Sequence, residues 1–240
     1  SAYEQSSDQE VAFQAVDYIL RVLKKNMIFG MTWGRAMHEF VEQLAKDERL
    51  RSLSFQNVKV VPFLGTPGAI QSDSWNTTTY SNTLATKVGN LLHCASYNLS
   101  APMYVEGTKE KELIESIDEI AKVLHMAETA DIALIGIGSM QDDSSIIKAE
   151  IRTKEEYKEL VRKGAVGEIV GRIYDKNGQT VDEDLKRKMV GISLDKIAKI
   201  PVRVGMSYGK DKIEAIKGAI AGGLVNVLVT DVPTAELLLK

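Results

Sequence analysis

Pro201-Val-Arg-Val-Gly-Met-Ser-Tyr-Gly-Lys-Asp-Lys-Ile-Glu-Ala-Ile216, followed by Leu224-Val-Asn-Val-Leu-Val-Thr-Asp231, decides the fold. Its short apolar run from Val202 to Met206 predicts a strand that ends in a turn. The second stretch is densely apolar, which is typical of a parallel strand covered by helices on both faces. Between the two strands, isoleucines recur at helical spacing, at Ile213, Ile216 and Ile220. We therefore predict a strand, helix and strand of an α/β sheet.

This unit also predicts a binding crevice. In open α/β sheets, ligands bind beyond the carboxyl ends of the strands, and Asp231 follows a predicted strand directly. Gly209 and Lys212 follow the preceding strand, where the amino end of a helix would direct free N–H groups at an anion. We expect this lysine, this carboxylate and this turn to converge on one ligand.

Composition narrows the class of protein. The chain has 240 residues, of which 44% are hydrophobic and 26% charged, as in an ordinary globular protein. A net charge of -3 and a pI near 5.8 argue against a broad basic surface for nucleic acid on this chain. A single cysteine, Cys94, cannot form an internal disulfide, and no apolar run is long enough to span a membrane. We expect a cytoplasmic protein without membrane contact.

A second strand, turn and helix unit lies near the start of the chain. Met27-Ile-Phe-Gly-Met-Thr32 reads as a strand, and an amphipathic helical pattern follows from Met37 to Leu44. The turn Trp33-Gly34-Arg35-Ala36 would then form the first turn of a helix at the carboxyl end of a strand, a second place suited to an anion. The alternative is that Gly34 merely permits a tight turn.

A third unit follows. Val58 to Leu64 predicts a strand, and a polar loop from Gly65 and Thr66 to about Thr78 is long enough to be a binding loop. Thr79 or Ser81 is expected to cap the next helix. That helix would place Asn82 and Thr83 in its first turn near the same crevice, with simple capping as the alternative role for both.

The middle of the chain adds further elements. We predict a strand over Pro102 to Glu106, an amphipathic helix over Leu113 to Met126, and a buried strand over Asp131 to Gly138 with a glycine-rich exit. That exit lacks the third glycine of a dinucleotide fingerprint, so we predict neither NAD nor any other cofactor. The stretch from Asp142 to Ala149 is polar and unpatterned.

The segment 164–182 differs in character from the rest. A capped, solvent-facing helix over Thr153 to Leu160 precedes it, and Asp175-Lys-Asn-Gly178 is a hairpin-type turn. We predict a small antiparallel excursion over the main sheet. Glu168 begins it, as either a solvated edge residue or a hydrogen-bond acceptor for a polyol.

In order and spacing, the motifs of nearly the whole chain resemble the effector-binding domains of SorC/DeoR-type bacterial transcription regulators. The motifs are Thr32-Trp33-Gly34, Ser81-Asn82-Thr83-Leu84, Gly164-Ala-Val-Gly-Glu168, Asp175-Lys-Asn-Gly178, Gly209 with Lys212, Ala215 and Ile216, and Leu228-Val-Thr-Asp231.

The resemblance implies a fold and a function. The fold is a Rossmann-like, mostly parallel sheet with helices on both faces, similar to the superfamily of sugar-phosphate isomerases, deaminases and CoA transferases. The chain would be one effector domain over residues 1–240. It would bind a phosphorylated sugar and so control the oligomeric state and the grip on operator DNA, which is read by an amino-terminal helix-turn-helix domain. We expect that domain to be absent here and Ser1-Ala2 to be a tag remnant, because the chain does not begin with Met.

The resemblance also assigns residues. The turn Trp33-Gly34-Arg35-Ala36 is similar to the family's phosphate-binding helix start, and Lys212 matches the lysine that contacts phosphate or a ring hydroxyl. Two positions depart from the pattern. Arg35 stands where relatives often have Thr and could add bidentate phosphate contacts. Leu64 stands where several relatives have Lys or Arg, which argues against a bisphosphate or a Schiff-base ligand.

An enzyme of the related superfamily, such as a sugar-phosphate isomerase, deaminase or lactonase, is the alternative function. It would need a general acid and base within reach of one carbon. His38, His93 and His125 all fall on predicted helices, and Glu168 with Lys212 is the one plausible pair. We therefore predict a sensor without catalytic residues.

We also predict at least a homodimer, or a homotetramer, because operators read by helix-turn-helix proteins are usually two-fold symmetric and isologous dimers are the commonest oligomers. The helix before Lys25 and the apolar helix over Pro233 to Leu239 could supply the interface. Packing of both helices against their own core is the alternative.

Overall fold

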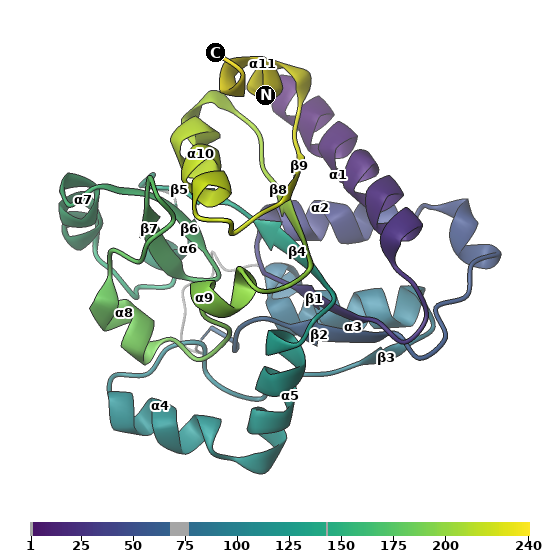
Figure 1. Cartoon of the computed structure of the whole chain (residues 1–240), viewed down its shortest axis with the longest axis horizontal. Coiled ribbons are helices and arrows are strands. Elements are labelled where there is room, and N and C mark those ends of the chain that lie inside the picture. Colours follow the sequence, from purple (N-terminus) through teal and green to yellow (C-terminus); the bar gives the residue numbers. More distant parts are fainter. Residues whose placement is uncertain (1, 68–76, 143) are drawn as a thin grey trace.

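The computed structural model describes residues 2–67, 77–142 and 144–240. Its centre is a six-stranded parallel sheet in the order β3-β2-β1-β4-β8-β9, which confirms the predicted α/β fold class (Figure 1). The strands are β1 (Ile28–Met31), β2 (Lys59–Pro62), β3 (Ala95–Ser96), β4 (Ile132–Gly136), β8 (Val202–Met206) and β9 (Val227–Val229).

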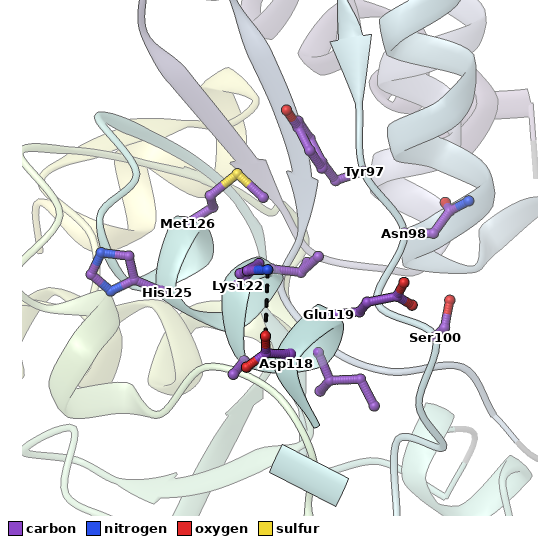
Figure 2. Close-up of a pocket in the computed structure, with 11 residues that line it drawn as sticks. Tyr97, Asn98, Ser100, Asp118, Glu119, Lys122, His125 and Met126 are labelled. Carbon is purple, nitrogen blue, oxygen red and sulfur yellow. Dashed lines mark ion pairs between the residues drawn. The ribbon is translucent and has the colours of Figure 1, made fainter. Parts of the chain in front are cut away.

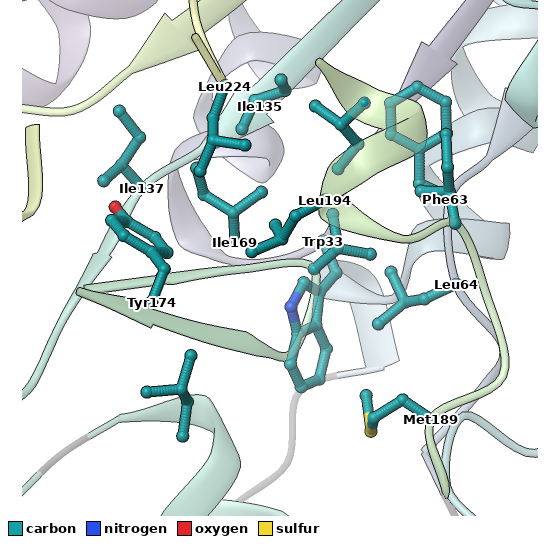
Figure 3. Close-up of a cluster of buried hydrophobic side chains, with 14 of the residues drawn as sticks. Trp33, Phe63, Leu64, Ile135, Ile137, Ile169, Tyr174, Met189, Leu194 and Leu224 are labelled. Atoms are coloured by element: carbon teal, nitrogen blue, oxygen red, sulfur yellow. The ribbon is translucent and has the colours of Figure 1, made fainter. Parts of the chain in front are cut away.

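Apolar side chains leave both faces of the sheet, because successive residues of a strand point to opposite sides. In β4, Ile132 and Leu134 belong to one buried cluster, whereas Ala133 and Ile135 belong to the other. Figure 3 shows Ile135 in the second cluster, near Leu224 and Ile169. The continuous apolar run of this strand therefore reflects burial on both faces.

Helices cover both faces. The first cluster packs α1 (Ala2–Val22), α2 (Arg35–Leu44) and α3 (Ser81–Leu91) on the sheet. The second contains apolar residues of α5 (Asp118–Glu128), α9 (Leu194–Ile197) and α10 (Ile213–Ala221). The apolar stripe of α1 is buried within its own chain, at Val11, Ala12, Ala15, Val16, Ile19 and Leu20. That finding favours core packing of α1 over an interface role for this stripe.

The predicted antiparallel excursion is present. The strands β5 (Gly138–Ser139), β6 (Ala165–Ile169) and β7 (Arg172–Asp175) form a three-stranded antiparallel sheet. Asp175 also organises the predicted turn, because its carboxylate accepts hydrogen bonds from the N–H groups of Asn177 and Gln179. Short helices surround this sheet: α6 (Ser145–Lys148), α7 (Lys154–Arg162) and α8 (Glu183–Lys188). Thr153 and Glu156 form the expected capping box at the start of α7.

Several predicted elements differ from the structure. The segment Leu113 to Met126 is not one helix, because α4 (Thr108–Glu115) ends at Glu115 and α5 begins after the extended residue Ile117. The segment Pro102 to Glu106 forms isolated bridges rather than a strand. The stretch 142–149 contains α6. The strand β9 pairs in parallel with β8, as predicted, and lies at the edge of the sheet, where Val227 and Leu228 are half-buried.

Two local predictions were also wrong. Tyr80, and not Thr79 or Ser81, occupies the N-cap position of α3. Its side chain makes no capping hydrogen bond. The hydroxyl of Ser81 donates instead to the carbonyl of Met31 at 3.1 Å. His93 lies beyond the end of α3 with a φ of 51° rather than on a helix. The polar loop predicted over 65–78 lies largely outside the described residues, since 68–76 are not described.

The carboxyl-terminal helix is present as α11 (Val232–Leu238). Over the described residues, no helix is both long and apolar enough to cross a membrane.

Candidate functional site

A polar cavity of about 220 Å³ lies beyond the carboxyl ends of β1, β4 and β8. The chain leaves β1 toward β2 on one side, and β4 lies on the other, so this is the point where the strand order reverses. Ligands of open α/β sheets bind at such switch points. The cavity is lined by Asp8, Trp33, Gly34, Arg35, Ala36, Gly136, Ile137, Gly138, Ser139, Ser144, Lys148, Glu168, Met206, Ser207, Tyr208 and Lys212.

The amino end of α2 opens into this cavity. Gly34 precedes the helix with a φ of 105°, a conformation that favours glycine, and no side chain caps the helix. The N–H of Gly34 donates to the carbonyl of Thr79 at 3.0 Å, so it is not available to a ligand. The next N–H groups, on Arg35 and Ala36, have no acceptor within the helix, as in any first turn. Together with the helix dipole they make this end attractive to an anion.

Glu168 forms the opposite wall and is 6% exposed, so it is not the solvated edge residue that was one of its two predicted roles. Its carboxylate accepts hydrogen bonds from the N–H of Gly171 at 2.6 Å and from the indole of Trp33. Gly138 allows it to lie close, because a Cβ atom at that position would stand 2.9 Å from Oε2. These contacts hold the carboxylate in one place.

The charge of Glu168 is set by two opposing effects. Burial raises the pKa of Glu168 above 4.5, whereas the hydrogen bond from Gly171 and the positive charge of Lys212 favour its ionised form and lower the pKa. The charge of Arg172, which is also buried, lowers the pKa of Glu168 as Lys212 does, but by less. Burial lowers the pKa of Arg172 to about 10, which still leaves its guanidinium charged at neutral pH.

Lys212 reaches the cavity from η3 (Lys210–Lys212), the 3₁₀ turn before α10. The turn is held by its neighbours: Ser139 donates to the Asp211 carboxylate at 3.2 Å, and Gly209 donates its N–H to Thr234 at 2.8 Å. The N–H of Gly209 is therefore not free for an anion, contrary to the prediction.

Asp231 also has a different role from the one predicted. It is 4% exposed, and its carboxylate caps α11 by accepting from the N–H of Thr234 at 3.0 Å. Neither Asp231 nor Gly209 lines the cavity. The carboxylate after β9 stabilises a helix start, and aspartate is one of the preferred residues at such an N-cap.

Four more predicted residues lie outside the cavity, around the loop after β2. Asn82 donates to Thr66 Oγ1 at 2.8 Å and to the Leu99 carbonyl at 3.0 Å, so it neither caps α3 nor reaches the cavity. Gly65 is buried where a Cβ would collide with the Ala101 carbonyl at 2.5 Å. Thr83 is half-buried on α3 and does not line the cavity.

Several lining residues were missed by sequence reasoning. Ser139 follows the predicted strand Asp131 to Gly138 and ends β5, and Ser207 directly follows β8. Each is 5% exposed, so the exits of the predicted strands could have indicated them. Lys148 and Ser144 lie in the segment that had no pattern, and Asp8 lies on the long first helix. No local pattern in the sequence distinguishes these three from surface residues.

The charges in the cavity favour an anion. Three basic side chains, Arg35, Lys148 and Lys212, face two carboxylates, Asp8 and Glu168, which gives a formal sum of +1 before the dipole of α2 is added. Serine hydroxyls and the fixed carboxylate of Glu168 can exchange hydrogen bonds with hydroxyl groups. Within the described ranges, no group of three or more histidine, cysteine, aspartate and glutamate side chains could hold a metal.

A second hollow differs from this cavity in its size, its polarity and the exposure of its polar residues. It is an open groove of about 700 Å³ along α5, and Figure 2 shows Tyr97 and Met126 on its walls with the Asp118–Lys122 ion pair. Ile120, Val123 and Ala121 make much of its floor apolar. The polar residues that line it, such as Asp118, Lys122 and His125, are exposed. Among the residues that the structure describes, the start of α5 is the one helix start that lines it.

Comparison with known proteins identifies the family. The family model described as "Putative sugar-binding domain" matches residues 1–240. The chain is 31% identical over 222 residues to the sorbitol operon regulator of Klebsiella pneumoniae, and 30% identical over 230 residues to the transcriptional regulator LsrR of Escherichia coli O157:H7. These alignments cover 92% and 94% of this chain, and 67% of each relative.

Solved structures agree with the sequence relatives. The full-length sorbitol operon regulator SorC from Klebsiella pneumoniae superposes with a TM-score of 0.87 at 28% identity, covering 99% of this chain and 74% of that one. The probable sor operon regulator from Shigella flexneri gives a TM-score of 0.85 at 26% identity, with 98% and 89% covered. The resemblance seen in the motifs is thus confirmed, and the chain belongs to the sugar-binding domain family of SorC/DeoR-type bacterial transcriptional regulators.

Proposed function

We propose that this domain senses a phosphorylated monosaccharide, which binds in the polar cavity. The observation that carries the proposal is the meeting of three features in one cavity: the uncapped amino end of α2, the ammonium of Lys212 and the buried carboxylate of Glu168. The first two suit a phosphate group, and the third suits a sugar hydroxyl. Membership of a sugar-binding family supports the sugar part of the ligand.

Each end of the ligand has its own partners in this proposal. The phosphate accepts from the N–H groups of Arg35 and Ala36 and from the ammonium of Lys212, which acts as a point charge. Glu168 accepts from a hydroxyl group of the sugar, and Ser139 and Ser207 contact neighbouring hydroxyls. Arg35 is exposed at the rim, so its guanidinium can close on the phosphate from the solvent side.

A sensor fits the cavity better than an enzyme does. A sugar-phosphate isomerase, deaminase or lactonase needs an acid and a base on opposite sides of the reacting carbon. Within the described residues, no histidine lines the cavity, and Glu168 is engaged by Gly171 and Trp33. The relatives compared above are named as regulators. Incubating the chain with sugar phosphates and following isomerised or hydrolysed product by NMR tests the enzyme alternative.

Contact with operator DNA is a separate part of this proposal. The chain spans about two thirds of the length of its curated relatives. We propose that a DNA-reading domain supplies the contact with operator DNA, and that the sugar phosphate acts on it through the domain described here. The acidic balance of the chain, a net charge of -3, is consistent with that division of work.

We further propose that the domain forms at least a dimer through the α5 groove. Beside the groove, Leu113 and Ile117 are 70% and 51% exposed, and together they form apolar surface that a second copy would cover. The charges of α5 are self-complementary: in an antiparallel pair of α5 helices around a two-fold axis, Asp118 of one copy can face Lys122 of the other. This interface differs from the two that the sequence predicted. The apolar stripe of α1 is buried, and the role predicted for the carboxyl-terminal helix α11 stays a prediction.

Thermal unfolding with added ligands tests the proposed function. A ligand that binds only the folded state stabilises it by about 2.7 kcal/mol when its concentration is 100 times its dissociation constant. We expect phosphorylated monosaccharides at millimolar concentration to raise the melting temperature of the chain, and their unphosphorylated counterparts to do much less. A panel of sugar phosphates that leaves the melting temperature unchanged contradicts the proposal.

A further inference from the structure

The long first helix reaches the candidate site. Because β1 begins at Ile28, shortly after α1 ends at Val22, the carboxyl end of α1 lies at the amino edge of the sheet. The opposite end of α1 therefore lies at the carboxyl edge, where the cavity opens. Figure 1 shows this amino end of α1 beside α11, which follows β9. With 21 residues, α1 is about 32 Å long, enough to run past the sheet on both sides.

Asp8 is the residue through which α1 enters the cavity. It is half-buried and lines the same space as Gly34, Arg35 and Ala36, the start of α2. From Val11 onward, α1 is packed against α2 and the sheet in one buried cluster. The position of Asp8 relative to the start of α2 is therefore fixed by the packing of the two helices. A carboxylate and the helix end that attracts anions thus line one cavity.

A carboxylate and a phosphate compete for the amino end of a helix. The amino end of a helix stabilises one negative charge, typically by a fraction of a kcal/mol to about 2 kcal/mol, and two anions side by side repel each other. The phosphate of the ligand, under the function proposed above, binds at this same helix start. The ligand and Asp8 therefore act on one electrostatic site.

We propose that Asp8 is the internal anion of the ligand-free site, and that the phosphate of the ligand displaces it. This inference rests on the proposed function and describes how ligand binding would be transmitted to α1. Because Asp8 is part of α1, its displacement loosens or shifts the first turns of α1, and any chain joined to the amino end of α1 experiences that change. Ligand binding is thereby converted into a change at the start of the domain.

The test compares the wild type with two variants of equal net charge. In D8N the internal anion becomes neutral, whereas in E10Q an exposed acid of the same helix, which does not line the cavity, is neutralised. We expect D8N to bind inorganic phosphate and monosaccharide phosphates about threefold to tenfold more tightly by titration calorimetry, because a competing charge is gone. For E10Q we expect a change of less than about twofold, since an exposed charge is screened.

Hydrogen exchange of the wild type supplies an independent readout. Saturating inorganic phosphate should speed the exchange of the amides of residues 6–12 in α1, and leave the exchange of the buried strand β4 unchanged. In D8N these amides should already exchange faster without phosphate. The wild-type measurement decides the proposal even if D8N folds poorly.

The outcomes separate the inference from the function beneath it. If the wild type binds phosphate and D8N binds it equally or more weakly, the competition is refuted and the proposed function stands. Unchanged exchange in residues 6–12 on phosphate binding refutes the displacement in the same way. If neither inorganic phosphate nor any monosaccharide phosphate binds to any of the three proteins, the proposed function itself fails and the inference falls with it.

Discussion

The polar cavity at the strand ends and the apolar groove along α5 differ in size and in the burial of their polar groups. The groove is about three times larger, at roughly 700 Å³ against 220 Å³, yet its polar groups are exposed and its floor is apolar. The cavity holds a carboxylate that is 6% exposed, fixed by two donors and opposed by a lysine. Burying a charge is costly unless it has partners, so a fixed buried carboxylate indicates a site for a polar ligand. Size alone would have chosen the other hollow.

The comparison is sharpest for two lysines. Replacing Lys212 with Ala should weaken the binding of a monosaccharide phosphate by roughly tenfold to a hundredfold, because a charge-assisted hydrogen bond contributes about 1.5–3 kcal/mol. Replacing Lys122 with Ala, in the groove, removes an equal charge from the chain and should leave that affinity within about twofold. Titration calorimetry measures both. Equal losses in the two variants would mean that the cavity is not the site.

A substitution beside the groove should change the dimer and leave the affinity for sugar phosphate unchanged. Ile117→Asp places a charge on the apolar surface that the proposed dimer covers, and losing the burial of one isoleucine costs about 1.5–3 kcal/mol for each copy. The dimer should therefore dissociate at least about tenfold more readily in analytical ultracentrifugation, while the affinity for sugar phosphate is retained. Light scattering of the wild type sets the reference. A wild-type mass close to the 26.5 kDa of one chain contradicts the dimer.

Arg35 should matter less than Lys212. Its guanidinium is exposed at the rim, where solvent screens its charge, so Arg35→Ala should weaken sugar-phosphate binding by about twofold to tenfold, and by less at high salt. The backbone N–H groups at the start of α2 survive this substitution. A loss larger than that of Lys212→Ala would assign the main phosphate contact to the arginine side chain.

Glu168 makes the stability of the empty domain depend on pH. Its folded-state pKa is raised by burial, so the folded state binds more protons than the unfolded state between pH 4.5 and that raised value. The free energy of unfolding contributed by this group therefore falls as pH rises through that window. Glu168→Gln keeps an acceptor for Gly171 and should remove this part of the pH dependence. Urea unfolding at several pH values from 4.5 to 8 measures it, and identical profiles for both proteins would contradict the assignment.

The fold was largely readable from the sequence because its strands are buried on both faces. Each of β1, β2, β4 and β8 lies in a mostly apolar run, interrupted by Lys59 in β2 and by Arg203 in β8, and these runs predicted the parallel sheet. The apolar pattern did not predict the position of a strand within the sheet, because an edge strand such as β9 has the same short apolar run as a central strand. The break between α4 and α5 was missed because Ile117 continues the helical spacing of apolar residues while its backbone is extended.

The candidate site was only half readable. The cavity is lined by six of the predicted residues, whose role in ligand binding stays a prediction: Trp33, Gly34, Arg35, Ala36, Glu168 and Lys212. Asn82 and Asp231 were also predicted there, but their side chains are used to hold a loop and to cap a helix. Asp8 and Lys148 could not be found, because the packing of α1 and α6 that brings them to the cavity leaves no local mark in the sequence.

Titration calorimetry of the wild-type chain with matched pairs of phosphorylated and unphosphorylated monosaccharides decides whether the polar cavity binds a sugar phosphate. We expect one saturable site per chain for at least one sugar phosphate, with its free counterpart bound at least about tenfold more weakly because the phosphate contacts are lost. The same titration of Lys212→Ala should weaken only the phosphorylated member of the pair. Equal affinity for both members, or binding that is unchanged in Lys212→Ala, would contradict the assignment of the polar cavity as a sugar-phosphate site.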